Sequence, residues 1–132
     1  MPVHKFDVET HTRSEMLDIT RLVRHAIDEA GVDDGVVTVF VPHTTAGVTI
    51  NENADPDVPH DILEHLDRAV PWRQPFYRHN EDNSAAHVKA SMMGSSVRVI
   101  VQRGRPLLGR WQGVFLCEFD GPRRREVWVS PC

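Results

Sequence analysis

The chain has 132 residues, of which 40% are hydrophobic and 26% are charged, and its formal net charge is -4. This length predicts a single domain over residues 1–132, and the composition excludes disordered, collagen-like and fibrous proteins. A weakly acidic chain is a poor non-specific ligand for phosphate backbones, so we expect no nucleic-acid partner. The cations are unusual, because only Lys5 and Lys89 are lysines among 15 basic residues, and eight histidines outnumber them.

No apolar run approaches the length of a membrane span, and the first residues contain no apolar signal region. We therefore expect a cytoplasmic protein without a membrane partner. The two cysteines, Cys117 and Cys132, form neither a disulfide framework nor a C-x-x-C metal motif. This usage is consistent with a reducing compartment.

The first half of the chain contains three predicted strands and one predicted helix. Phe6 and Val8 alternate with acidic residues, which predicts a half-buried strand. Apolar residues then recur at helical spacing over residues 19–30, and Gly31 supplies a helix C-cap. The run VVTVFV at residues 36–41 is apolar on both faces and predicts a central strand, followed by another strand over residues 46–50.

The second half adds two helices and three strands. The spacing predicts a helix over residues 59–70 and a short one over residues 84–93, which begins after a cap at Asn83 or Ser84. Strands are expected at residues 97–101, 114–119 and 127–129. Regular alternation of parallel strands and helices is missing, so we predict an α+β fold of largely antiparallel sheets with about three inserted helices.

The segment at residues 51–67 holds six acidic residues and no lysine or arginine. Carboxylates and short amides are ligands that Mg²⁺ prefers, which makes Asp55, Asp57 and Asp61 candidate ligands. Residues of these types also form turns and helix caps, and the spacing alone favours neither interpretation.

Histidines and one lysine offer a second kind of site. His43 follows a buried strand, and His87 lies among small residues on the short helix. His43, His79 and His87 together could hold a transition metal such as Zn²⁺, although a lone histidine is more often a structural hydrogen-bonding group. Lys89 falls within the apolar stripe of its helix, so its ammonium either reaches solvent or binds an anion in a pocket.

Three successive blocks resemble the signature of the YjbQ family, whose members are known as secondary thiamine-phosphate synthases. They are VPHTTAGVTINENADPDV, YRHNEDNSAAHVKASMMGSSV and LLGRWQGVFLCEFDGPR. The resemblance implies a compact α+β homotrimer that holds a metal ion near clustered histidines. Arg110 departs from the pattern, because the family usually has threonine before its Trp-Gln pair, and this difference could alter the substrate.

Carried over to this sequence, the resemblance implies a transferase that joins hydroxymethylpyrimidine diphosphate to thiazole phosphate with loss of pyrophosphate. The expected catalytic residues are His43, Asp61, His87 and Lys89. The expected metal ligands, for Mg²⁺ or Zn²⁺, are His43, His79, His87, Asp55 and Asp57. The expected substrate-binding residues are Thr44, Asn51, Asn53, Asn83, Trp111 and Gln112.

Two alternatives use the same residues. In the first, a histidine-bound metal activates water and the protein is a hydrolase. In the second, a trimer binds a small phosphorylated metabolite without important catalysis, since no nucleophile and base pair is recognisable in the sequence.

Overall fold

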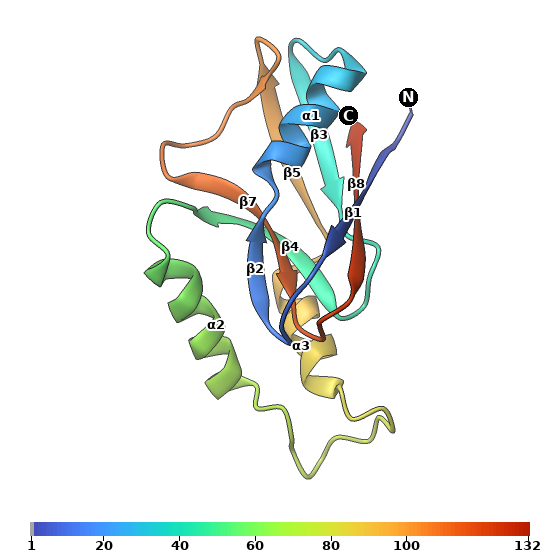
Figure 1. Ribbon diagram of the computed structural model, residues 1–132, viewed down its shortest axis with the longest axis vertical. Helices are drawn as coiled ribbons and strands as arrows, with labels where there is room; N and C mark the ends of the chain where they lie inside the picture. Colours follow the sequence, from blue (N-terminus) through green and yellow to red (C-terminus); the bar gives the residue numbers. More distant parts are fainter. Residues whose placement is uncertain (1) are drawn as a thin grey trace.

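Two antiparallel sheets form the body of the protein in a computed structural model that describes residues 2–132 (Figure 1). The larger sheet has the strand order β1-β8-β3-β5-β6, and the smaller has the order β2-β7-β4. In chain order the strands are β1 (His4–Glu9), β2 (Glu15–Asp18), β3 (Gly35–Phe40), β4 (Ala46–Glu52), β5 (Ser96–Gln102), β6 (Arg105–Pro106), β7 (Gln112–Glu118) and β8 (Arg124–Pro131). The helices are α1 (Thr20–Ala30), α2 (Asp57–Ala69) and α3 (Ser84–Met93).

This architecture confirms the predicted α+β class with antiparallel sheets and three helices. The α1 helix ends at Gly31 in the left-handed conformation, and α3 has the predicted bounds. The α2 helix begins two residues before the predicted start. Strands β2 and β6 were not predicted, because four and two residues are too few to show a period of two.

Strand β7 is buried on both faces and separates two hydrophobic clusters. Val114 and Leu116 face a core shared by both sheets and α1. Phe115 and Cys117 face the opposite way, toward α2 and α3. Since side chains alternate along a strand, Glu118 belongs to the face of Val114 and Leu116, between the two sheets. Burial raises the pKa of the Cys117 thiol to about 12, so this cysteine is an apolar packing residue.

The two helices that cover the smaller sheet are packed to different extents. A Cβ atom on Gly47 of β4 would lie 2.7 Å from the carbonyl oxygen of Gly94, so only glycine allows the end of α3 to approach this closely. By contrast, α2 buries only Leu66 and lies at one side of the body (Figure 1). No helix within residues 2–132 is both long and apolar enough to span a membrane.

Candidate functional site

A hollow of about 480 Å³ opens between the corner before β4 and the α3 helix. His43 and Thr44 come from the corner, and His87 and Ser91 come from one face of α3. The remaining lining residues are small: Ala46, Ala90, Gly94 and Ser95. The structure therefore brings together three of the predicted site residues, His43, Thr44 and His87, and adds the hydroxyl of Ser91.

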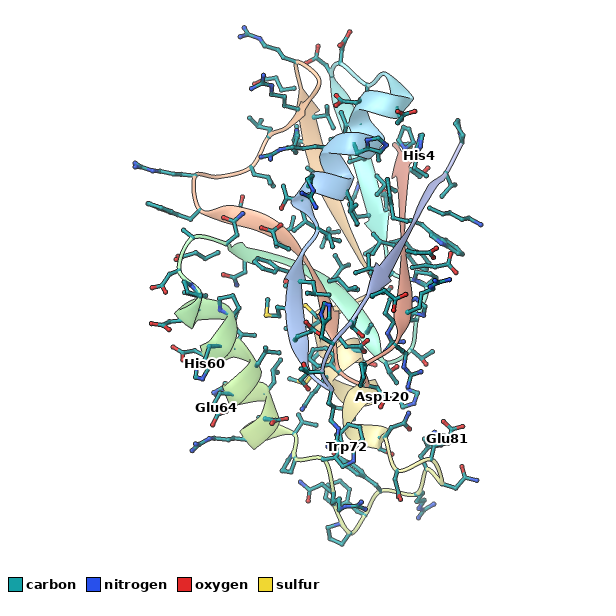
Figure 2. The ribbon with its side chains drawn as sticks, viewed as in Figure 1. His4, His60, Glu64, Trp72, Glu81 and Asp120 are labelled. Carbon is teal, nitrogen blue, oxygen red and sulfur yellow. The ribbon has the colours of Figure 1, made fainter. Side chains whose placement is uncertain are left out.

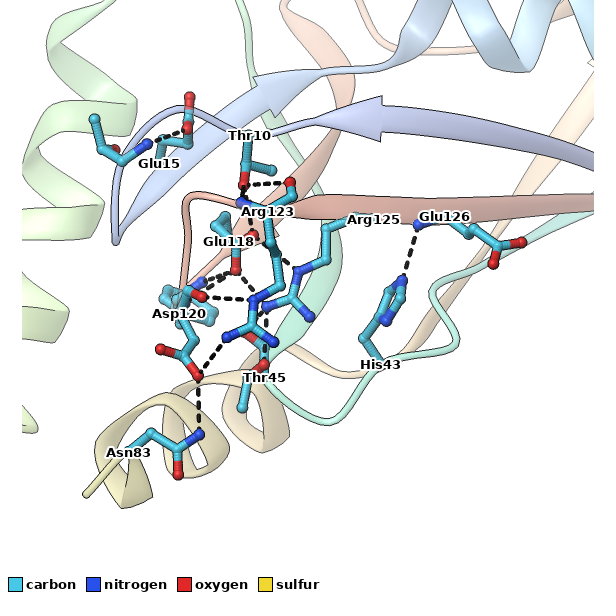
Figure 3. A network of polar contacts seen from close by, with 12 residues as sticks. Thr10, Glu15, His43, Thr45, Asn83, Glu118, Asp120, Arg123, Arg125 and Glu126 are labelled. Atoms are coloured by element: carbon cyan, nitrogen blue, oxygen red, sulfur yellow. Dashed lines mark hydrogen bonds and ion pairs between the residues drawn. The ribbon is translucent and has the colours of Figure 1, made fainter. Parts of the chain in front are cut away.

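His43 is held by the backbone of β8. The amide of Glu126 donates a hydrogen bond of 2.8 Å to Nε2 of His43 (Figure 3). Nε2 is then unprotonated, and a neutral imidazole carries its proton on Nδ1. Burial, followed by the Arg125 guanidinium, lowers the pKa of His43, which favours this neutral form. His43 thus offers an N–H donor and lacks a free lone pair, so its predicted role as a metal ligand does not fit this geometry.

A buried ion pair lies behind this corner and joins the two sheets. Arg125 is 3% exposed and Glu118 is fully buried, and Nε of Arg125 donates to Glu118 at 2.8 Å (Figure 3). Nη2 of Arg125 also donates to the hydroxyl of Thr45 at 2.8 Å, and the hydroxyl of Thr10 donates to Glu118 at 2.8 Å. Burial opposes ionisation of Glu118, but the bonds from Arg125, the Asp120 amide and Thr10 outweigh it and lower its pKa. The network fixes the backbone on which His43 and Thr44 stand.

Asn83 is the N-cap residue of α3, the helix that carries His87, and His79 precedes it in the chain. The rings of His79 and His87 meet edge to face, with centroids 5.3 Å apart. Asn83 Nδ2 donates to Asp120 at 2.9 Å, and Arg123 donates to the same carboxylate oxygen at 3.1 Å. The Asn83 carbonyl oxygen is buried without a hydrogen-bond partner. Asn83 therefore holds Asp120, and neither Asn83 nor His79 lines the hollow.

The predicted metal ligands do not form one cluster in the chain. Among the described residues, no group of three or more His, Cys, Asp or Glu side chains is placed to hold a metal ion. His79 and His87 are adjacent imidazoles and fit a transition metal better than Mg²⁺. They would supply two ligands, and the remaining coordination positions of the metal would be filled by substrate, by water or by another subunit.

The acidic segment lies apart from the histidines. The Asp55 carboxylate accepts the amide of Asp57 at 2.9 Å, in the turn that leads into α2. Asp61 contacts His60, with 3.0 Å between Oδ1 and Nδ1, on the exposed face of α2. Figure 2 shows His60 and Glu64 projecting from this helix, away from Asp120. The contacts of Asp55 and Asp57 are those of turn-forming residues, and none of the three predicted aspartates lines the hollow.

The other predicted substrate-binding residues gather at the far end of β4 and β7. The side chain of Asn53 makes contacts within the protein: its amide nitrogen donates to Asp18 at 3.1 Å, and the side chain packs beneath Gly113. Gln112 accepts the Gly109 amide at 2.8 Å, and Trp111 is 54% exposed beneath the Arg110 guanidinium. Asn51 is exposed in the same region. At about 3.3 Å per residue, this end of β4 lies roughly 20 Å from the His43 end.

Lys89 is the most surprising of the predicted residues. It is 2% exposed, and its ammonium donates to Asp67 of α2 at 2.6 Å. Residues two apart on a helix point about 200° apart, so Lys89 and His87 face opposite sides of α3. Lys89 thus ties α2 to α3, and it does not line the hollow with His43.

Sequence reasoning missed the Glu118–Arg125 pair. A signal was present, because Arg125 alternates with Val127 and Val129 and therefore shares their inward face. Glu118 likewise lies between Cys117 and Phe119 in an apolar stretch. Two opposite charges in apolar strands indicate a buried pair, since an unpaired buried charge is strongly unfavourable.

Comparison with known proteins assigns the chain to a family. The profile described as "UPF0047 protein YjbQ-like" matches residues 4–132. A UPF0047 protein of Methanocaldococcus jannaschii is 52% identical over 96% of this chain and 91% of its own length. The UPF0047 protein YugU of Bacillus subtilis is 51% identical over 93% of each chain.

Solved structures agree in fold. An uncharacterized YjbQ/UPF0047 family protein from Clostridium acetobutylicum has 52% identity and a TM-score of 0.95, covering 98% of this chain and 99% of its own. A hypothetical protein from Aeropyrum pernix K1 has 36% identity and a TM-score of 0.93, covering 100% of this chain and 98% of its own. With a match of this extent in sequence and in fold, the chain belongs to the YjbQ-like UPF0047 family.

Proposed function

We propose that this protein is a transferase of the thiamine-phosphate synthase type, working as a weak secondary activity at the hollow formed by His43, Thr44 and His87. The observation that carries the proposal is the state of His43. Its Nε2 accepts the Glu126 amide, and the remaining Nδ1–H is a donor suited to a phosphoryl oxygen. The hydroxyls of Thr44 and Ser91 add two further donors around the same hollow.

The chemistry requires charge stabilisation more than covalent help. The thiazole nitrogen forms a C–N bond to the pyrimidine methylene carbon as the C–O bond to diphosphate breaks. The bonding electrons leave with pyrophosphate, so negative charge grows on the leaving group. Donors fixed in place before the reaction stabilise such charge most effectively. The Glu118–Arg125 network supplies this fixity by holding Thr45 and the adjacent corner.

A divalent metal is part of the proposal. His79 and His87 are the residues that would hold it, and imidazole ligands favour Zn²⁺ over Mg²⁺. When bound, the ion would neutralise charge on the departing diphosphate. Because Asp55, Asp57 and Asp61 are not gathered into a cluster, we assign no step to Mg²⁺ at the acidic segment.

Histidine-bound metal also keeps a second candidate function open. The same two imidazoles could present a metal ion to water, which would make the protein a hydrolase of a phosphorylated metabolite. In the other alternative, a binding protein, the hollow would hold the metabolite without turnover.

The expected assembly is a cytoplasmic homotrimer, as the family resemblance implies. Trp111 and Gln112 lie roughly 20 Å along the sheet from His43 in one chain, so they could complete the same site only from another subunit. Light scattering on the purified protein measures the subunit number directly.

The test is a product assay with both proposed substrates. We expect thiamine phosphate and pyrophosphate to form in equal amounts, and His87→Gln to slow the reaction by about 100-fold or more. His25→Gln on α1, where His25 is exposed beside Glu29, is the matched control and should keep the wild-type rate. Cleavage of the diphosphate without a joined product would favour the hydrolase. Saturable binding with neither product would favour the binding protein.

A further inference from the structure

A second hollow lies at the opposite end of the larger sheet. It has a volume of about 720 Å³ and is lined by Arg24 and Asp28 of α1 and by residues 103–106 of the β5–β6 hairpin. The hairpin stands beside α1 at one end of the molecule, whereas α3 lies at the other (Figure 1). Ser95, just before β5, lines the hollow of His43, so the seven residues of β5 separate the two hollows by roughly 20 Å.

The hairpin that forms one wall is fixed to the loop after α1. The Gly104 amide donates to the Asp33 carbonyl at 2.8 Å, and the Arg103 amide donates to the Asp34 carboxylate at 3.2 Å. The backbone positions of the hairpin and α1 are therefore tied together, and the side chains of Arg103 and Arg105 extend from a defined frame.

The side chains that line this hollow carry an excess of positive charge. Three arginines, Arg24, Arg103 and Arg105, line it with one carboxylate, that of Asp28. In the part of the chain that the structure describes, none of these three guanidinium groups lies within 4.0 Å of a carboxylate. Ion pairs do occupy five other arginines: Arg68, Arg73, Arg123, Arg124 and Arg125.

Arg103, the first residue of the turn between β5 and β6, has an unusual backbone conformation. Arg103 and Gly104 have φ angles of 53° and 73°, the two positive values that define the tight turn of a two-residue hairpin. Asn, Asp and Gly are the favoured residues at the first position, because a larger side chain is strained there. An arginine at this position adds a third basic residue to the lining of the hollow, at a local conformational cost.

We infer that this hollow binds a small, multiply charged phosphorylated anion. Guanidinium groups present paired N–H donors that match phosphoryl oxygens, and three of them suit a ligand with at least two negative charges. The volume lies within the range of small-molecule sites. Pro106 is the one apolar side chain in the lining, so the phosphoryl groups supply most of the recognition. This site is separate from the hollow of His43, and its failure would leave the proposed function intact.

Titration with inorganic pyrophosphate, followed by NMR of backbone amides, tests the assignment. We expect saturable shifts at residues 103–105 and on α1 in the His87→Gln variant, in which binding at the other hollow is weakened. Arg103→Gln and Arg105→Gln should each weaken this binding about tenfold. Asp28→Asn removes the opposing carboxylate and should tighten binding several-fold, an effect that misfolding cannot imitate.

Arg98→Gln is the matched control. Arg98 is an exposed arginine on β5 that does not line the hollow, and its loss should leave the affinity for pyrophosphate unchanged. Equal weakening by Arg98→Gln would indicate general charge attraction and would overturn the site. Absence of shifts at residues 103–105 would also overturn it. The site would likewise be overturned if pyrophosphate did not bind and single-stranded RNA or anionic vesicles bound in a manner that depends on Arg103 and Arg105.

Discussion

The corner that carries His43 and the acidic helix α2 differ in how they are attached to the protein. The corner is bonded to β8 through His43 and to both sheets through Thr45, Arg125 and Glu118. The α2 helix buries one side chain, Leu66, and its acidic residues are exposed, with Asp67 alone bonded to a buried group, the ammonium of Lys89. A site that stabilises developing charge needs donors that are already in place, so the corner is the better catalytic platform.

The largest expected effect concerns the buried pair behind the corner. Arg125→Ala leaves the Glu118 carboxylate buried without its main partner, and we expect a loss of about 3–5 kcal/mol in the free energy of unfolding. Urea denaturation measures this loss. The neighbouring variant Arg124→Ala is the control, since Arg124 makes an exposed pair with Glu9 and should have little effect. Equal effects for the two variants would contradict the role of the network.

A smaller effect is expected where α2 meets α3. Asp67→Ala deprives the buried Lys89 ammonium of its carboxylate and should cost about 1–3 kcal/mol, toward the lower value because Asp67 is largely exposed. Lys89→Met removes the buried charge together with its need for a partner and should cost less than Asp67→Ala. The reverse order in thermal or urea unfolding would show that Lys89 has another partner. Glu64→Ala on the same helix is the exposed control.

The smallest effect is a dependence of stability on pH. The pKa of His43 is lowered in the folded protein, so the unfolded chain takes up the proton first as the pH falls below about 6.5. The stability that His43 contributes is fully present above that pH. It is lost as the pH falls through the pKa of His43 in the folded protein, where protonation breaks the hydrogen bond from the Glu126 amide. The lowered pKa of Glu118 gives a second loss at pH values below 4.5.

His43→Gln separates these two ranges. Its side-chain oxygen can accept the Glu126 amide but does not titrate. We therefore expect this variant to lose the decrease that begins near pH 6.5 and to retain the one below 4.5. An unchanged profile in urea unfolding at successive pH values would show that another group causes the first decrease.

Hydrophobic period and helix caps were sufficient to predict most of the fold. The α1 helix with its Gly31 cap, the α3 helix and the central strand β3 all appear where the pattern indicated them. The site was less predictable, because distances between separate elements depend on how the strands pair. His43 and His87 come together since α3 packs against β4, whereas Trp111 is carried to the far end of the same strand pair. Charge alone was a poor guide to the site, because the clustered acidic residues predicted a metal site at residues 51–67, whereas Arg125 gave no comparable signal in the sequence.

The central claim is that the hollow of His43 and His87, and not the acidic segment, performs the chemistry. The most direct measurement compares the rate of thiamine phosphate formation in His87→Gln with that in Asp57→Asn. We predict a loss of about 100-fold or more for His87→Gln and a rate within about twofold of the wild type for Asp57→Asn. A large loss for Asp57→Asn with an unchanged rate for His87→Gln would contradict the account.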